Sequence, residues 1–215
     1  MKKIFTLILT CIMMFVLAAC QNAADSSEKT QTPETIAKEE ATMTKKSETM
    51  PEETTGGTKK ELIVYFSWSG NTESVAKEIE KQTGADVFRI VPTEAYTDDY
   101  DTLLDIAQKE QQSGARPAIF GSIKNFDSYE IVYLGYPNWW GDMPMILYSF
   151  LDDYDLSGKT IIPFVTSGGS GFSNTISTIE NMEPNALVLD GLSLLNSQTD
   201  APHDAVADWL SGLGL

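Results

Sequence analysis

The segment Phe66–Thr72 reads FSWSGNT, a short polar loop with no lysine, arginine or cysteine. The apolar run Leu62–Phe66 leads into it, and Glu73–Gln82, which has a helical period, follows it. A strand, a small polar loop and a helix start in this order form a cradle for an anion, because free N–H groups and the helix dipole both favour negative charge. The candidate phosphate-binding residues are Ser67, Trp68, Ser69, Gly70, Asn71 and Thr72. An ordinary capped turn between a strand and a helix is the alternative at this point.

Several phosphate chemistries are excluded by what this loop lacks. A Walker loop needs the pattern GxxxxGK[ST], and the loop has no lysine to reach the outer phosphates. A phosphatase of similar topology needs a cysteine nucleophile and an arginine, and a receiver domain needs an acidic cluster with a lysine. The chain has two cysteines, Cys11 and Cys20, both far from the loop. The sequence therefore predicts a bound phosphate group that is held without a cation.

A second loop, Pro137–Met143, places two adjacent indoles beside a proline and a glycine. Indole rings at a loop tip provide a stacking surface for a flat, apolar ligand, and backbone groups next to a glycine can bond its polar edge. The candidate residues here are Pro137, Asn138, Trp139, Trp140 and Gly141. The alternative is that both indoles fill the hydrophobic core.

A third loop, Thr166–Ser173, reads TSGGSGFS and offers free N–H groups in a pliable backbone. Such a loop suits the far edge of a ring system. The candidate residues are Thr166, Ser167, Gly168, Gly169, Ser170 and Gly171.

The elements that must position these loops alternate between strand-length apolar runs and segments of helical period. The expected strands are 62–66, 87–91, 131–136, 160–165 and 186–189, and the expected helices are 73–82, 101–112, 145–151, 174–182 and 204–213. This alternation predicts an α/β fold, a doubly wound five-stranded parallel sheet with helices on both faces. Ligands of such sheets bind beyond the carboxyl ends of the strands, where all three loops are expected.

Taken together, FSWSGNT, GYPNWWGDMP and TSGGSG resemble the corresponding loops of flavodoxins, in particular short flavodoxin-like proteins. The segment AYTDDYDTLLDIAQKEQQSGARPAI, residues 95–119, is similar to that subgroup as well. The resemblance implies noncovalent FMN, with its phosphate in Ser67–Thr72 and its isoalloxazine between the second and third loops. Classical flavodoxins place a tyrosine against the flavin from the third loop, whereas this chain offers only Phe172 there. The Trp139-Trp140-Gly141 run also resembles flavin-dependent quinone reductases of related fold.

The N-terminal region has the layout of an export signal. Met1-Lys2-Lys3 and the apolar run 4–17 are typical of a signal peptide, and Leu17-Ala18-Ala19-Cys20 resembles the lipobox of bacterial lipoproteins. That resemblance implies cleavage before Cys20 and lipidation of its thiol. Three parts are therefore expected: a signal peptide (1–19), a lipid-anchored disordered tether (20–60) without aromatic residues, and a flavodoxin-like domain (61–215) on the extracytoplasmic side of the membrane.

Charge limits the partners of this domain. Residues 61–215 hold 23 acidic and 7 basic residues, a net charge of −16. Nucleic acid is not expected to bind, because phosphate backbones require basic surfaces. A redox partner protein with a basic docking face fits this charge.

Four functions follow from these features. An FMN electron carrier is the first, and an FMN-dependent reductase of quinones or nitro compounds is the second. A hydrolase would use Ser69 or Ser170 with His203, the one histidine, but the pattern GxSxG is absent. The fourth is a binding module that has lost its flavin.

Overall fold

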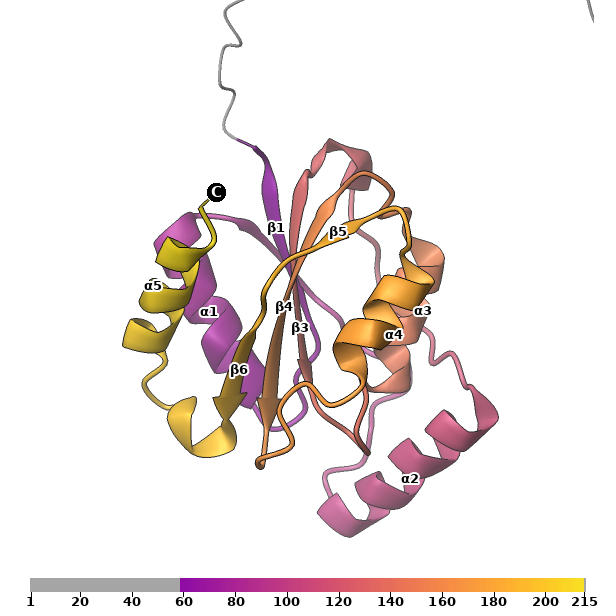
Figure 1. Cartoon of the computed structure of the whole chain (residues 1–215). Helices are drawn as coiled ribbons and strands as arrows, with labels where there is room; N and C mark the ends of the chain where they lie inside the picture. Colours follow the sequence, from indigo (N-terminus) through magenta and orange to yellow (C-terminus); the bar gives the residue numbers. More distant parts are fainter. Residues whose placement is uncertain (1–58, 215) are drawn as a thin grey trace, which may run out of the picture. The chain divides into compact units, whose positions relative to one another are not determined.

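The computed structural model describes residues 59–214, which form a parallel sheet between two layers of helices (Figure 1). The predicted signal peptide, Cys20 and nearly all of the predicted tether lie outside these residues. The strands are β1 (Glu61–Tyr65), β2 (Asp86–Arg89), β3 (Ile131–Pro137), β4 (Thr160–Ser167), β5 (Leu187–Val188) and β6 (Leu192–Leu195). Their order is β2-β1-β3-β4-β5, with β6 also paired to β4, and every pairing is parallel. The predicted doubly wound fold is confirmed.

The fifth strand position differs from the prediction in one respect, because two short segments occupy it. β5 pairs with the start of β4 and β6 with its end, whereas the sequence analysis expected one strand, 186–189, and missed β6. Pro163 lies between the two paired stretches of β4, and a proline has no N–H to donate to a ladder. Gly191 passes close beside it, since an added Cβ would lie 2.5 Å from the Pro163 carbonyl oxygen.

The helices are α1 (Asn71–Thr83), α2 (Tyr100–Ser113), α3 (Met145–Asp153), α4 (Thr175–Met182) and α5 (His203–Gly212), with short 3₁₀ turns η1 (Phe126–Ser128) and η2 (Asn196–Gln198). Figure 1 shows α1 and α5 on one face of the sheet and α3 and α4 on the other. Successive side chains of strand β1 point to opposite faces of the sheet and so belong to two separate core clusters. Leu62 and Val64 pack toward α3 and α4, whereas Ile63 and Tyr65 pack toward α1 and α5.

Helix α2 buries few of its side chains. Its N-cap Asp99 accepts a hydrogen bond from the Thr102 N–H, which fixes where the helix begins. Only Leu103 and Ala107 are buried along its 14 residues. Figure 1 shows it beside the end of the sheet where the strand arrows point, so it borders the expected ligand region.

Within residues 59–214, no helix is both long enough and apolar enough to span a membrane.

Candidate functional site

A cavity of about 410 Å³ opens at the carboxyl ends of β1, β3 and β4, where the three predicted loops converge. Ten of the predicted residues line it: Trp68, Ser69, Asn71, Pro137, Asn138, Trp139, Trp140, Thr166, Ser167 and Gly168. None of its lining residues is charged. The cavity therefore offers hydroxyls, amides and aromatic faces, and any anion in it must be held by neutral groups and by helix α1.

The first loop ends in an open helix N-terminus. Gly70 has φ 92°, a left-handed conformation that glycine adopts without strain, and its N–H donates to Ser67 Oγ at 3.2 Å. The N–H groups of Asn71 and Thr72 meet no acceptor within residues 59–214. The Asn71 side chain is held from outside the loop, because its Oδ1 accepts a hydrogen bond from Thr199 Oγ1 at 3.1 Å. These unused N–H groups are the kind that bind an anion at a helix start.

Thr72 has a structural contact that the sequence did not reveal. Its Oγ1 lies 2.8 Å from Thr166 Oγ1, and both side chains are buried. This hydrogen bond ties the start of α1 to the end of β4. It therefore fixes the first loop relative to the third.

The second loop forms a tight turn. Trp139 and Asp142 exchange two backbone hydrogen bonds, of 2.8 and 3.1 Å, around Trp140 and Gly141. Both central residues have positive φ, 54° at Trp140 and 79° at Gly141. This is the pattern of a type I′ turn, in which asparagine is the usual first central residue. The turn projects Trp140 outward, with 48% of the residue exposed.

The two indoles of this turn differ in environment. Trp139 packs edge-to-face on Phe66 and on Tyr96, each at a centroid distance of 5.5 Å. Trp140 instead donates its Nε1–H to the Leu104 carbonyl of α2 at 3.1 Å. Both line the cavity. Trp139 thus serves the core and the cavity together, whereas Trp140 serves mainly the cavity and its rim.

The third loop is organised around the Ser167 hydroxyl, which accepts the N–H groups of Gly169 at 3.2 Å and Gly171 at 3.0 Å. Asn138 joins this loop to the second, because its Nδ2 donates to the Gly171 carbonyl at 2.8 Å. The two loops that would enclose a ring system are therefore held to each other.

Phe172, the one aromatic residue of the third loop, does not provide a stacking surface for the cavity. It packs against the core over Gly191, where an added Cβ would lie 2.5 Å from its ring, and it does not line the cavity. The remaining predicted residues belong to the same three loops but do not line the cavity: Ser67, Gly70, Thr72, Gly141, Gly169, Ser170 and Gly171.

Five lining residues were missed by the sequence analysis: Tyr100, Leu103, Leu104, Ala107 and Asn196. Four of them lie on α2, and Tyr100 packs against Trp68 at a centroid distance of 6.2 Å. The apolar face of residues 101–112 was visible in the sequence, but nothing local showed that it covers the first loop. Asn196 follows β6, the strand that was not predicted.

A second cavity of about 490 Å³ is lined by Tyr96, Glu110 and Arg116, among other residues. The Tyr96 hydroxyl donates to Glu110 Oε2 at 2.8 Å. Burial raises the pKa of both groups, although the hydrogen bond opposes the rise at Glu110. Glu110 is on α2, so this bond helps to hold α2 beside the first cavity.

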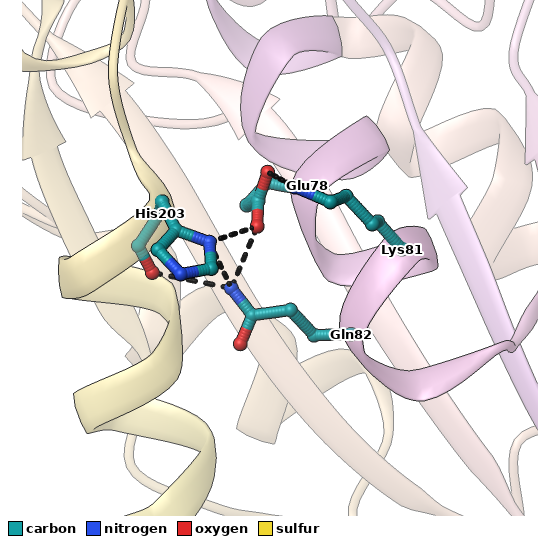
Figure 2. Close-up of polar contacts among 4 residues, drawn as sticks. All are labelled: Glu78, Lys81, Gln82 and His203. Atoms are coloured by element: carbon teal, nitrogen blue, oxygen red, sulfur yellow. Dashed lines mark hydrogen bonds and ion pairs between the residues drawn. The ribbon is translucent and has the colours of Figure 1, made fainter.

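His203 is the first residue of α5 and faces Glu78 and Gln82 of α1 (Figure 2). Its Nδ1 lies 2.6 Å from Glu78 Oε1, and its carbonyl accepts from Gln82 Nε2 at 3.1 Å. No hydrogen bond within residues 59–214 joins it to Ser69 or Ser170, so the described contacts give no support to a hydrolase. The same residues contain no group of three or more His, Cys, Asp or Glu side chains suited to a metal.

Comparison with known proteins agrees with this architecture. Residues 60–213 match the family model described as flavodoxin. The chain belongs to the flavodoxin family. No curated protein sequence matches it.

Solved structures of other flavodoxin-like proteins resemble this one. A candidate flavoprotein from Bacteroides eggerthii is 31% identical with a TM-score of 0.65, covering 73% of this chain and 98% of that one. A second, from Bacteroides uniformis, is 29% identical with a TM-score of 0.65, covering 71% and 98%. A flavoprotein from Lactobacillus acidophilus, solved in complex with FMN, is 23% identical with a TM-score of 0.58, covering 69% and 99%. The last comparison supports the shared fold.

Proposed function

We propose that this flavodoxin binds FMN in the cavity at the carboxyl ends of β1, β3 and β4 and transfers electrons between proteins. The observation that carries the proposal is the convergence of three loops on an uncharged cavity with two indoles in its wall and a helix N-terminus beside it. The relative from Lactobacillus acidophilus, solved with FMN, has the same fold. The cavity of about 410 Å³ falls within the range for small-ligand sites, and the free N–H groups beside its neutral lining fit an anionic phosphate.

The phosphate would be held by the start of α1. The N–H groups of Asn71 and Thr72 are free of protein acceptors within residues 59–214, and Ser69 adds a hydroxyl to the cavity wall. The partial positive charge of the helix N-terminus replaces a cationic side chain. Because this cradle is fixed by the Thr72–Thr166 hydrogen bond, little ordering remains to be done on binding.

The ring system would lie against Trp139 and Trp140, with Gly168 and the third loop at its far edge. FMN would supply the electron-accepting chemistry, and the protein would orient it and exclude water. The cavity is near the small end of the range for ligand sites, so a bound flavin leaves little space for a second substrate. This favours an electron carrier over the alternative, a reductase of quinones or nitro compounds.

The acidic surface suggests the kind of partner. Asp98, Asp99 and Asp101 are exposed at the start of α2, next to Tyr100 on the cavity rim. A partner with a basic face would be steered toward this rim by charge. We further propose that lipidation of Cys20 holds the domain at the outer side of the cell membrane, a proposal that rests on the sequence of residues 1–20.

The test is a titration of the purified apoprotein with FMN and with riboflavin, followed by flavin fluorescence. FMN should bind at least about tenfold more tightly than riboflavin. Riboflavin has no phosphate, so it cannot accept the charge-assisted hydrogen bonds of the first loop. Equal affinities would overturn the phosphate site, and no binding of either flavin would overturn the flavoprotein. Rapid turnover of a quinone with a nicotinamide donor would instead establish the reductase.

A further inference from the structure

The turn that carries the indoles is held in an unfavourable conformation. Trp140 has φ 54°, and a bulky side chain rarely adopts this left-handed conformation. Such a conformation persists only where neighbouring contacts determine it. The contacts around Trp140 should therefore include one strong anchor.

Asp142, the last residue of the turn, has the contacts of such an anchor. Its Oδ1 accepts the Met143 N–H at 2.8 Å. Its Oδ2 accepts the Tyr148 hydroxyl of α3 at 2.9 Å and the Thr178 hydroxyl of α4 at 3.1 Å. One carboxylate thus joins the turn to two helices on the same face of the sheet (Figure 1).

The surroundings of Asp142 strengthen these hydrogen bonds. Tyr136 is fully buried near the Asp142 carboxylate, and burial together with that carboxylate raises the pKa of Tyr148 to about 12. Hydrogen bonds to a charged acceptor in a partly desolvated place are stronger than those between neutral groups. The hydroxyl of Tyr148 therefore remains a donor across the physiological pH range.

We propose that Asp142 is a positioning residue of the flavin site, which fixes the Trp139–Asp142 turn to α3 and α4 and so sets where Trp140 meets the flavin. Asp142 does not line the cavity, so it acts through the turn and not by contact with the ligand. The part of this inference that concerns the flavin rests on the proposed function. The part that concerns the turn does not.

The test uses variants at residues that do not line the cavity. Tyr148→Phe and Thr178→Val each remove one donor to Asp142 and keep its charge, and Asp142→Ala removes the acceptor. Tyr154→Phe is the matched control, because the Tyr154 hydroxyl accepts the Ile123 N–H at 2.9 Å and makes no hydrogen bond to the turn within residues 59–214. Two quantities are measured for each protein: hydrogen exchange of the Trp139 and Asp142 amides without flavin, and the dissociation constant of FMN.

In Tyr148→Phe, exchange of both amides should speed up about tenfold and FMN should bind about five- to tenfold more weakly, whereas Tyr154→Phe should match the parent in both. The double variant Asp142→Ala, Tyr148→Phe should bind FMN no more weakly than Asp142→Ala alone, because both remove the same contact. If Asp142→Ala does not fold, Tyr148→Phe decides the question. Parental exchange and parental FMN affinity in Tyr148→Phe would overturn the inference. If the parent itself binds no FMN, the proposed function fails, and the amide exchange still decides whether Asp142 holds the turn.

Discussion

Replacing the two indoles of the second loop one at a time should show that Trp139 contributes more to stability and that Trp140 contributes to FMN binding. Trp139 is half-buried and makes two edge-to-face contacts, so Trp139→Ala should cost about 3 kcal/mol, the low end for a core tryptophan. For a domain of this size, that loss lowers Tm by about 6–12 °C. Trp140 is 48% exposed and makes one hydrogen bond, so Trp140→Ala should cost only about 1 kcal/mol, or about 2–4 °C.

The flavin measurement should give a different ranking. Stacking of a flat ring on an aromatic side chain contributes about 1–3 kcal/mol, so Trp140→Ala should weaken FMN binding about 5- to 150-fold despite its small effect on Tm. Alanine also has a Cβ, so a positive φ at residue 140 remains unfavourable, and the variant loses the indole ring together with its hydrogen bond to the Leu104 carbonyl. The assays are thermal unfolding of the apoproteins by circular dichroism and FMN titration of the same samples. Equal losses of Tm in the two variants, or parental FMN affinity in Trp140→Ala, would refute the division.

Three further predictions concern stability. Gly135→Ala should lower the free energy of unfolding by more than about 2 kcal/mol or prevent folding, because its Cβ would lie 2.1 Å from the Phe164 ring. Gly212→Ala is the control, because its Cβ would lie in open space at the end of α5, and it should be neutral or slightly stabilising. Urea denaturation measures both free energies. Burial, with charge from nearby aspartates, raises the pKa of Glu183 to about 7, so this group makes the fold less stable as pH rises from 4.5 through about 7. Glu183→Gln should therefore add about 1 kcal/mol at pH 8, after allowance for solvent screening, and nothing at pH 4; a gain at both pH values would contradict this reasoning. His203→Ala should slightly lower Tm and leave FMN affinity unchanged, and a loss of affinity would show that the start of α5 communicates with the cavity.

The sequence predicted most of the layered fold, because the burial of strands and helices produces regular patterns of apolar residues along the chain. Strands β1, β3 and β4 are covered on both faces and read as continuous apolar runs, so they were found within one or two residues. The strand at the edge of the sheet was harder to predict. β6 is a four-residue strand with two exposed positions, Ser193 and Leu195, and its existence depends on pairing with β4 beyond Pro163. A contact between segments about 30 residues apart leaves no local period to read.

Part of the candidate site could likewise be predicted from the sequence, and part depended on the tertiary structure. Loop composition alone identified the first loop, the indole turn and the glycine-rich loop, because small, polar and aromatic residues at the ends of buried strands are unusual and local. The tertiary structure decided that α2 covers the cavity, that Trp139 packs on Tyr96 while Trp140 stays exposed, and that Asp142 bonds to helices α3 and α4. Each of these depends on where side chains from distant segments meet, and the chain determines that only after its apolar faces have packed.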